Sequence, residues 1–275
     1  MTFIQALILG IIQGLTEFLP ISSSAHLVIA PFILGWTFPE QQVLPFDVLV
    51  QLGTLLAVII YFWADLWAII KAFILGLVKL KPFADPLARQ GWLLILASIP
   101  AGLAGLLLKK AVDQAFQSVV ITGVFLLVTA LFLTAAEWIG KRRRSLETLN
   151  WLDAVLMGVG QALAIFPGIS RSGATMSAGL ARDLDRTAAA RFSFLMSIPI
   201  MLAAGAVEIK DVLDIPGLSG TLPMIGVGFI AAAIVGYFSI RWLLRFITTH
   251  SLRPFAVYCA GLGLLVIILY VIFPH

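Results

Sequence analysis

The sequence predicts an all-α integral membrane protein, an inverted repeat with two re-entrant helical hairpins and about six transmembrane helices. The composition, the length of the apolar runs and a repeated motif lead to this class. The chain has 275 residues, of which 61% are hydrophobic and 12% are charged, and its mean hydropathy is +1.05. A soluble domain carries about 25% charged residues. So few charges could not cover a surface that faces water.

The apolar runs have the length of helices rather than the roughly ten-residue alternating runs of a membrane β-barrel. Helices are expected because each backbone polar group in hydrocarbon must be satisfied within its own segment. The runs that start near residues 91, 118, 222 and 254 reach the roughly 20 residues that cross a bilayer.

Two segments that lie 148 positions apart are variants of one another. Residues 10–24 match residues 158–172 at seven of fifteen positions without a gap, whereas chance in this composition would give about one or two matches. Proline or glycine interrupts each segment, and the flanking apolar pieces are too short to cross. Irregular backbone at membrane depth needs protein or water around it. We therefore predict two re-entrant hairpins, over residues 3–36 and 151–182.

Each hairpin precedes three predicted crossings, which divides the single membrane domain 1–275 into repeats of about 1–140 and 150–275. Three is odd, so the second repeat is inverted. The weak point is 45–79, because two crossings there would break this parity. The net charge of +4 lies mostly in short loops beside the crossings, as orientation signals do, which argues against a nucleic-acid partner. The Lys and Arg residues gather in the loops of one side, which marks that side as the inside. This bias predicts that both termini and the entrance of the first hairpin face outward.

The tip of the first hairpin carries a polar cluster. Gln13 and Glu17 are four residues apart and share one helical face, and a carboxylate within a membrane is by default a functional-site hypothesis. Ser22 and Ser23 precede the helix that contains His26, and the free N–H groups of such a helix start bind phosphate. The alternatives are a structural carboxylate at Glu17, a satisfied core histidine, and serines that act only as helix caps. Capping is the preferred interpretation for Ser24 and Ser172.

The tip of the second hairpin carries the matching cationic half. Arg171 needs an anionic partner at membrane depth, and its guanidinium fork fits phosphate oxygens. The alternative is a structural ion pair with Glu17. Gly168 allows close backbone approach, and Thr175 shares the helical face of Arg171. We expect these residues to bind an anion together with the two neighbouring serines, Ser170 and Ser172.

Over essentially its whole length the chain resembles the bacterial undecaprenyl pyrophosphate phosphatases of the bacitracin-resistance type. The resemblance rests on Gln13-Gly-Leu-Thr-Glu17 with its continuation to His26, and on Pro-Gly-Ile-Ser-Arg-Ser-Gly-Ala-Thr at 167–175. Segments 46–53 and 191–199 are also similar to the family. Gln13 stands where the family also has glutamate, so Glu17 is the only carboxylate of that pair.

The resemblance implies hydrolysis of undecaprenyl diphosphate to the monophosphate, which recycles the lipid carrier for cell-wall synthesis and confers resistance to bacitracin. It places the reaction at the outer face of the inner membrane and implies a divalent cation, Mg²⁺ or Ca²⁺. Glu17, with Gln13 and the phosphates of the substrate, would hold that cation. Arg171 would clamp the diphosphate. Ser23 or Ser22 would attack phosphorus with His26 as base; alternatively, His26 would attack phosphorus itself, or it would activate water.

The competing class is a transporter or flippase for a lipid phosphate or another anion, because inverted repeats and broken helices are typical of alternating access. The combination of nucleophile, base, acid and anion-clamp side chains favours an enzyme. Contacts with membrane lipid are expected throughout. The sequence gives no oligomeric state, and a homodimer is compatible with it.

Overall fold

The computed structural model describes residues 1–215 and 217–272, and this part of the chain is helical. Its six helices that are long and apolar enough to cross a membrane cover Gln42–Tyr61, Pro86–Leu107, Val119–Ile139, Arg186–Lys210, Leu218–Thr249 and Arg253–Ile272. The described helices are α1 (Phe3–Phe18), α2 (Ser23–Leu34), α3 (Glu40–Tyr61), α4 (Trp63–Val78), α5 (Pro86–Leu107), α6 (Lys109–Phe116), α7 (Val119–Ile139), the 3-10 helix η1 (Leu146–Thr148), α8 (Trp151–Leu163), α9 (Arg171–Ala181), α10 (Arg186–Leu213), α11 (Leu218–Thr249) and α12 (Arg253–Ile272). The predicted all-α membrane class is confirmed.

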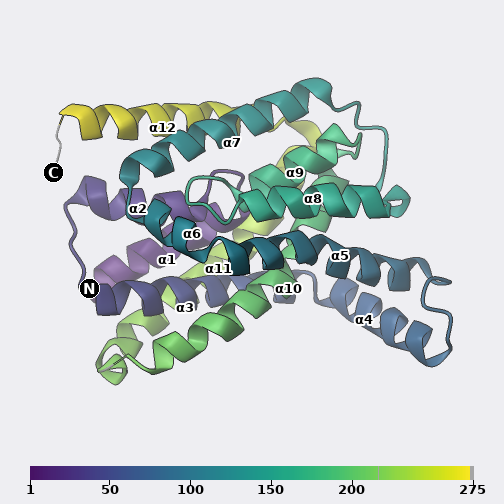
Figure 1. The fold of residues 1–275 in the computed structure, drawn as a ribbon, viewed down its shortest axis with the longest axis horizontal. Helices are drawn as coiled ribbons and strands as arrows, with labels where there is room; N and C mark the ends of the chain where they lie inside the picture. The colour runs from purple at the N-terminus through teal and green to yellow at the C-terminus, as the bar shows by residue number, and fades with distance from the viewer. Residues whose placement is uncertain (216, 273–275) are drawn as a thin grey trace.

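Two short helical hairpins approach one another from opposite ends of the bundle. Helices α1 and α2 form the first hairpin, and α8 and α9 form the second. Figure 1 shows α1 beginning and α12 ending at the left, whereas the loops before α5 and α8 lie at the right. Three long helical runs follow each hairpin, so the arrangement is consistent with an inverted repeat.

The segment 45–79, which left the parity open, runs in one direction. Helices α3 and α4 meet at Phe62, whose N–H donates to the carbonyl of Val58 while its own carbonyl accepts from the N–H of Leu66. Helical hydrogen bonds therefore continue through the junction, and α4 extends onward from α3 rather than turning back (Figure 1). The chain returns only after residue 79, along α5. This preserves the odd number of long runs in the first repeat.

Each hairpin packs its first helix against a long helix of the other repeat through glycine. A Cβ atom on Gly10 of α1 would lie 2.4 Å from the carbonyl oxygen of Gly228 on α11. A Cβ on Gly158, the equivalent position of α8, would lie 2.5 Å from the carbonyl oxygen of Ala97 on α5. Gly10 therefore serves close helix packing. The two repeats use the same position for the same contact.

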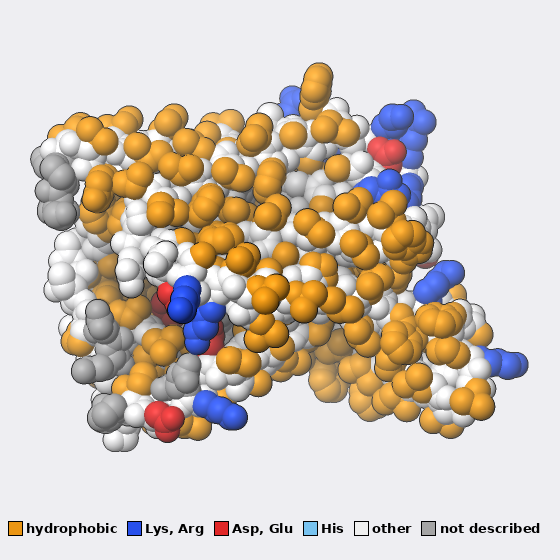
Figure 2. All heavy atoms as spheres, viewed as in Figure 1, with side chains coloured by type: hydrophobic (Ala, Val, Ile, Leu, Met, Phe, Trp, Pro, Cys, Tyr) orange, Lys and Arg blue, Asp and Glu red, His pale blue; other side chains and the backbone are white. Residues whose placement is uncertain are grey.

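Lys and Arg side chains gather at the right of Figure 2, which we call the basic end. Arginines bind two buried carboxylates beside the junction of α7 and α8, which lies at that end (Figure 1). Glu137, near the end of α7, accepts hydrogen bonds from Arg142 and Arg186 and from the N–H of Leu252. Asp153, in the first turn of α8, accepts from Arg144 and Arg182. The hydrogen bonds to Asp153 raise the pKa of the Arg144 guanidinium above its ordinary value. These ion pairs connect the loop before α8 to both helices of the second hairpin, α8 and α9.

We predict that Gly158→Ala lowers the stability of the folded protein by about 1–3 kcal/mol, because the added methyl group overlaps the α5 backbone. The measurement is the midpoint of thermal unfolding of the purified protein in detergent. The matched control is Gly102→Ala on α5, where an added Cβ would meet no atom within 4 Å. A Gly158→Ala protein as stable as the control would contradict the close packing.

Candidate active site

The tips of the two hairpins meet at the carboxylate of Glu17, a buried residue that is 8% exposed as a whole. Arg171 donates from Nη2 to Glu17 Oε1 at 2.6 Å. Ser23 donates from Oγ to Glu17 Oε2 at 2.6 Å, and Gln13 donates from Nε2 to the same oxygen at 2.9 Å. Ser23 and Arg171 occupy equivalent positions of the two repeats, 148 residues apart. Equivalent residues of both hairpins therefore bind the two oxygens of one carboxylate.

The backbone of the first tip turns sharply between α1 and α2. Helix α1 ends at Phe18, ahead of Pro20, and Ser22 has a φ of 69°, which is rare for a residue other than glycine. Ser22 is the N-cap of α2, and its Oγ accepts from the N–H of Ala25 at 3.3 Å. The turn places Ser23 at the first position of α2, facing back toward Glu17.

The second tip is held by helix α7. Gly168 has a φ of 101°, and a Cβ there would lie 2.4 Å from the carbonyl oxygen of Thr122, so only glycine fits. Thr129 Oγ1 donates to the carbonyl of Gly168 and accepts from the N–H of Ser170, both at 2.9 Å. Ser170 in turn caps α9 by accepting from the N–H of Gly173. Gly168 and Ser170 thus orient the start of α9, where Arg171 lies.

The capping serines are the first of each group rather than the third. Ser22 and Ser170 are the N-caps, so the assignment of that role to Ser24 and Ser172 was wrong. The physical reason is that α2 and α9 begin one residue after the first serine of each group, which leaves its Oγ beside the free N–H groups. Ser172 instead donates to the carbonyl of Leu19 in the first hairpin at 3.0 Å, a second link between the tips.

The hydroxyl of Thr175 lies within internal hydrogen bonds. It donates to the carbonyl of Arg171 at 2.7 Å and pairs with the hydroxyl of Ser193 on α10 at 2.6 Å. Thr175 therefore fixes α9 against α10 in this structure. Its role as a donor to substrate stays a prediction.

The side chain of His26 does not pair with a serine hydroxyl. Its Nδ1 lies 2.7 Å from the carbonyl oxygen of Ser22, and its Nε2 lies 2.7 Å from the hydroxyl of Tyr258 on α12. Ser23, the nucleophile candidate, has Glu17 as its hydrogen-bond partner instead. The structure thus brings Glu17, Ser23 and Arg171 together and places His26 on the neighbouring turn of α2.

Several residues of the site were absent from the sequence-based prediction. Thr54 lies 3.4 Å from Gln13 Nε2, Thr129 holds the second tip, and Ser193 and Tyr258 bind Thr175 and His26. Thr54 directly follows, and Ser193 lies within, the two additional segments that resemble the family, which was an available signal. Thr129 and Tyr258 lie in apolar helices, and no local pattern distinguishes them.

The match to a family model covers residues 6–265 and carries the description bacitracin resistance protein BacA. The chain belongs to this family. Curated relatives named undecaprenyl-diphosphatase include a protein from a Nocardioides species, 44% identical over 97% of this chain and 96% of the relative. Others come from Micrococcus luteus, 45% identical over 96% and 95% of the two chains, and from Methanosphaera stadtmanae, 41% identical over 98% of each.

The oxygen atoms available to a cation in this BacA-family site are few. Among the residues that the structure describes, no group of three or more His, Cys, Asp or Glu side chains could hold a metal ion. Glu17 accepts from three donors. Gln13 Oε1, however, is buried and has no hydrogen-bond partner, and it belongs to the amide that binds Glu17. The pair fits a cation that takes its remaining oxygen ligands from a phosphate-rich substrate.

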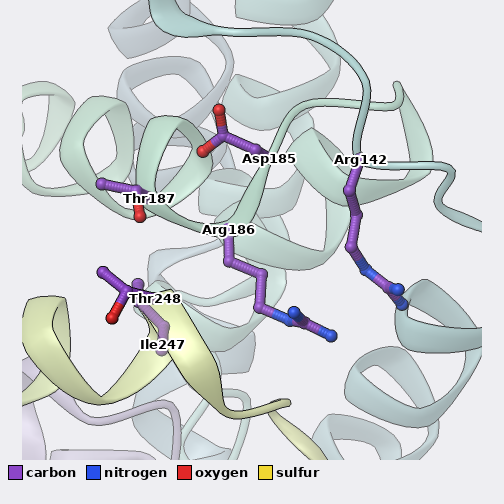
Figure 3. A pocket seen from close by; sticks show the side chains of 6 residues that line it. All are labelled: Arg142, Asp185, Arg186, Thr187, Ile247 and Thr248. Carbon is purple, nitrogen blue, oxygen red and sulfur yellow. The ribbon is translucent and has the colours of Figure 1, made fainter.

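A separate cavity of about 330 Å³ is lined by none of the residues of the hairpin tips, and Figure 3 shows the side chains that line it. Arg142, Arg186, Asp185, Thr187, Ile247 and Thr248 line it. Arg142 and Arg186 both bind Glu137, and Asp185 caps α10 by accepting from the N–H of Ala188. Its charged side chains therefore have structural partners, and we assign the chemistry to the tips.

Proposed function

We propose that this protein hydrolyses undecaprenyl diphosphate to undecaprenyl phosphate and inorganic phosphate, which recycles the lipid carrier and confers resistance to bacitracin. Arg171, Ser23 and Glu17 lie together where the two hairpin tips meet, and this arrangement is the main support for the proposal. An anion clamp, a hydroxyl nucleophile and a carboxylate base are groups that can catalyse phosphoryl transfer. The names of the relatives support the same reaction.

Arg171 binds the diphosphate in this proposal without leaving Glu17. A guanidinium has five N–H donors in a fork, and the ion pair with Glu17 uses Nη2. The remaining donors can reach phosphate oxygens, and the N–H groups at the start of α9 add to the positive potential. The ion pair orients the clamp, so the structural and the functional interpretations of Arg171 are compatible.

Ser23 is the proposed nucleophile, with Glu17 as its base. Its hydroxyl already donates to the Glu17 carboxylate at 2.6 Å. In the first step Ser23 Oγ bonds to the terminal phosphorus, the bond from that phosphorus to the bridging oxygen breaks, undecaprenyl phosphate leaves, and Glu17 takes the proton. In the second step water attacks the phosphorus of phosphoserine and gives its proton to His26, while the bond from phosphorus to Ser23 Oγ breaks. Glu17 returns its proton to Ser23 Oγ, phosphate is released, and His26 passes its proton to solvent.

Gln13 and Glu17 would hold a divalent cation, Mg²⁺ or Ca²⁺, together with oxygens of the diphosphate. When bound, the cation neutralises part of the charge on the phosphates. The unpartnered Oε1 of Gln13 supports this assignment. One carboxylate makes a weak site for a hard cation, so the substrate has to contribute much of the coordination.

The proposed location is the inner membrane, with the active site open to its outer face. Lys and Arg side chains gather at the end of the molecule where the second hairpin enters (Figure 2), and such a bias marks the cytoplasmic side. The first hairpin, with Glu17 and Ser23, enters from the opposite end (Figure 1).

We expect Arg171→Ala to abolish phosphate release from a prenyl diphosphate, a loss of at least about 10³-fold because the anion clamp is gone. The assay uses detergent-solubilised protein, in which a transporter without hydrolytic activity would release nothing. Arg171→Lys keeps the charge without the fork and should retain partial activity. Thermal unfolding of both variants checks that they fold. Normal turnover by a folded Arg171→Ala protein would contradict the clamp.

Acid quenching during turnover of a terminally labelled prenyl diphosphate should trap phosphate on Ser23, identified by mass spectrometry of the peptide. Ser23→Ala should remove both the trapped phosphate and the activity. Ser24→Ala is the matched control and should keep both. A phosphate found on His26 or Ser22, or rapid turnover by Ser23→Ala, would reject Ser23 as nucleophile.

Removal of divalent cations by a chelator should stop turnover, and Mg²⁺ or Ca²⁺ should restore it. Gln13→Glu adds a second carboxylate to the pair, so this variant should reach half-maximal activity at a cation concentration about tenfold lower. Gln5→Glu, on the same helix and outside the site, should leave the requirement unchanged. Full activity of the chelated protein would remove the cation from the proposal.

A further inference from the structure

The imidazole of His26 has a hydrogen-bond partner at each ring nitrogen, and these partners determine its tautomer. The carbonyl oxygen of Ser22 can only accept, so Nδ1, 2.7 Å away, carries the hydrogen. In the neutral ring Nε2 then has a lone pair, and the hydroxyl of Tyr258 donates to it at 2.7 Å. Nε2 is therefore the one ring atom of His26 that can take a proton.

Tyr258 reaches His26 from the other repeat. It lies in the second turn of α12, and its ring stacks on the imidazole with 5.7 Å between centroids and 5° between planes. The next residue, Cys259, is buried and donates from Sγ to the carbonyl of Pro20 in the hairpin turn. Helix α12 thus contacts the first tip on both sides of Ser22 and fixes the plane of the imidazole.

We infer that Tyr258 holds the imidazole of His26 through Nε2 and passes the proton of the attacking water to it. A phenol hydroxyl both donates and accepts. It donates to the single lone pair of neutral Nε2, so the proton of the attacking water reaches Nε2 through this hydroxyl, which takes the proton from water as it gives its own hydrogen to Nε2 and then accepts from Nε2–H. His26 therefore keeps a partner in both protonation states and does not have to swing away. The inference rests on the proposed role of His26 as the base for water.

Tyr258→Phe keeps the stacked ring and removes only the hydroxyl. We expect kcat for phosphate release to fall about tenfold with KM within twofold, a smaller effect than the 10²–10⁴-fold that loss of a general base costs. In a His26→Gln background the same change should cost nothing further, since the two residues act as a unit. Tyr270→Phe, later on α12, is the matched control and should behave as wild type.

A second measurement reports the contact without activity. The chain has three histidines, so ¹⁵N-histidine labelling gives few ring signals, and His26→Gln identifies those of His26. The Nε2 resonance of His26 should move in Tyr258→Phe and stay in place in Tyr270→Phe. If the wild-type protein released no phosphate, the proposed function would be wrong. The Nε2 resonance of His26 would still show whether Tyr258 contacts the imidazole.

Three results would overturn the inference. One is a Tyr258→Phe protein with the kcat of wild type. Another is an equal loss of kcat from Tyr258→Phe in the wild-type and His26→Gln backgrounds, which would show that the hydroxyl acts independently of His26. The third is an unchanged Nε2 resonance in Tyr258→Phe.

Discussion

The need to satisfy one buried carboxylate organises the hairpin tips. Glu17 lies where water is largely excluded, and a charge there is costly unless it is paired and hydrogen-bonded. Its three donors come from α1, the start of α2 and the start of α9. Both hairpin tips must therefore lie beside Glu17. The hydrogen bond from Ser172 to the carbonyl of Leu19 adds a second contact between the tips. The same carboxylate is the proposed base, so the contact that joins the repeats is also the reactive one.

The two ends of the bundle differ in the interactions that anchor the base of each hairpin. At the basic end Asp153 and Glu137 have arginine partners from the loop before α8, the end of α9 and the start of α10. At the opposite end the first residue of the chain binds Gln42, and Thr2 caps α1. Ionic contacts thus fix the second hairpin at its base, and the clamp residue Arg171 extends from that fixed element.

The sequence predicted the class, the two hairpins and most of the polar cluster because these features leave local signals. A repeated motif marks Glu17 and Arg171, and proline and glycine mark the turns. The hydrogen-bond partners of the site residues could not be predicted. Thr129 and Tyr258 are single polar residues in apolar helices, and only the tertiary packing brings them to the second tip and to His26. The helix caps were missed because the exact first residue of a helix also depends on tertiary packing. A difference of two residues in the start of α2 decides between Ser22 and Ser24 as its N-cap. Dependence on tertiary packing also applies to His26, which the resemblance offered as the base for Ser23 or Ser22, whereas its side chain contacts the Ser22 carbonyl and Tyr258.

We propose that substrate binds where the two tips meet, with one repeat supplying the base and the other the clamp. A structure of the protein with a non-hydrolysable methylene analogue of a prenyl diphosphate would test this most directly. We expect the terminal phosphonate to lie between Arg171 and Ser23, with oxygens near Gln13 and Glu17. A diphosphonate bound at the basic end instead, beside Arg142 and Arg186, with the Glu17 site unchanged, would contradict it.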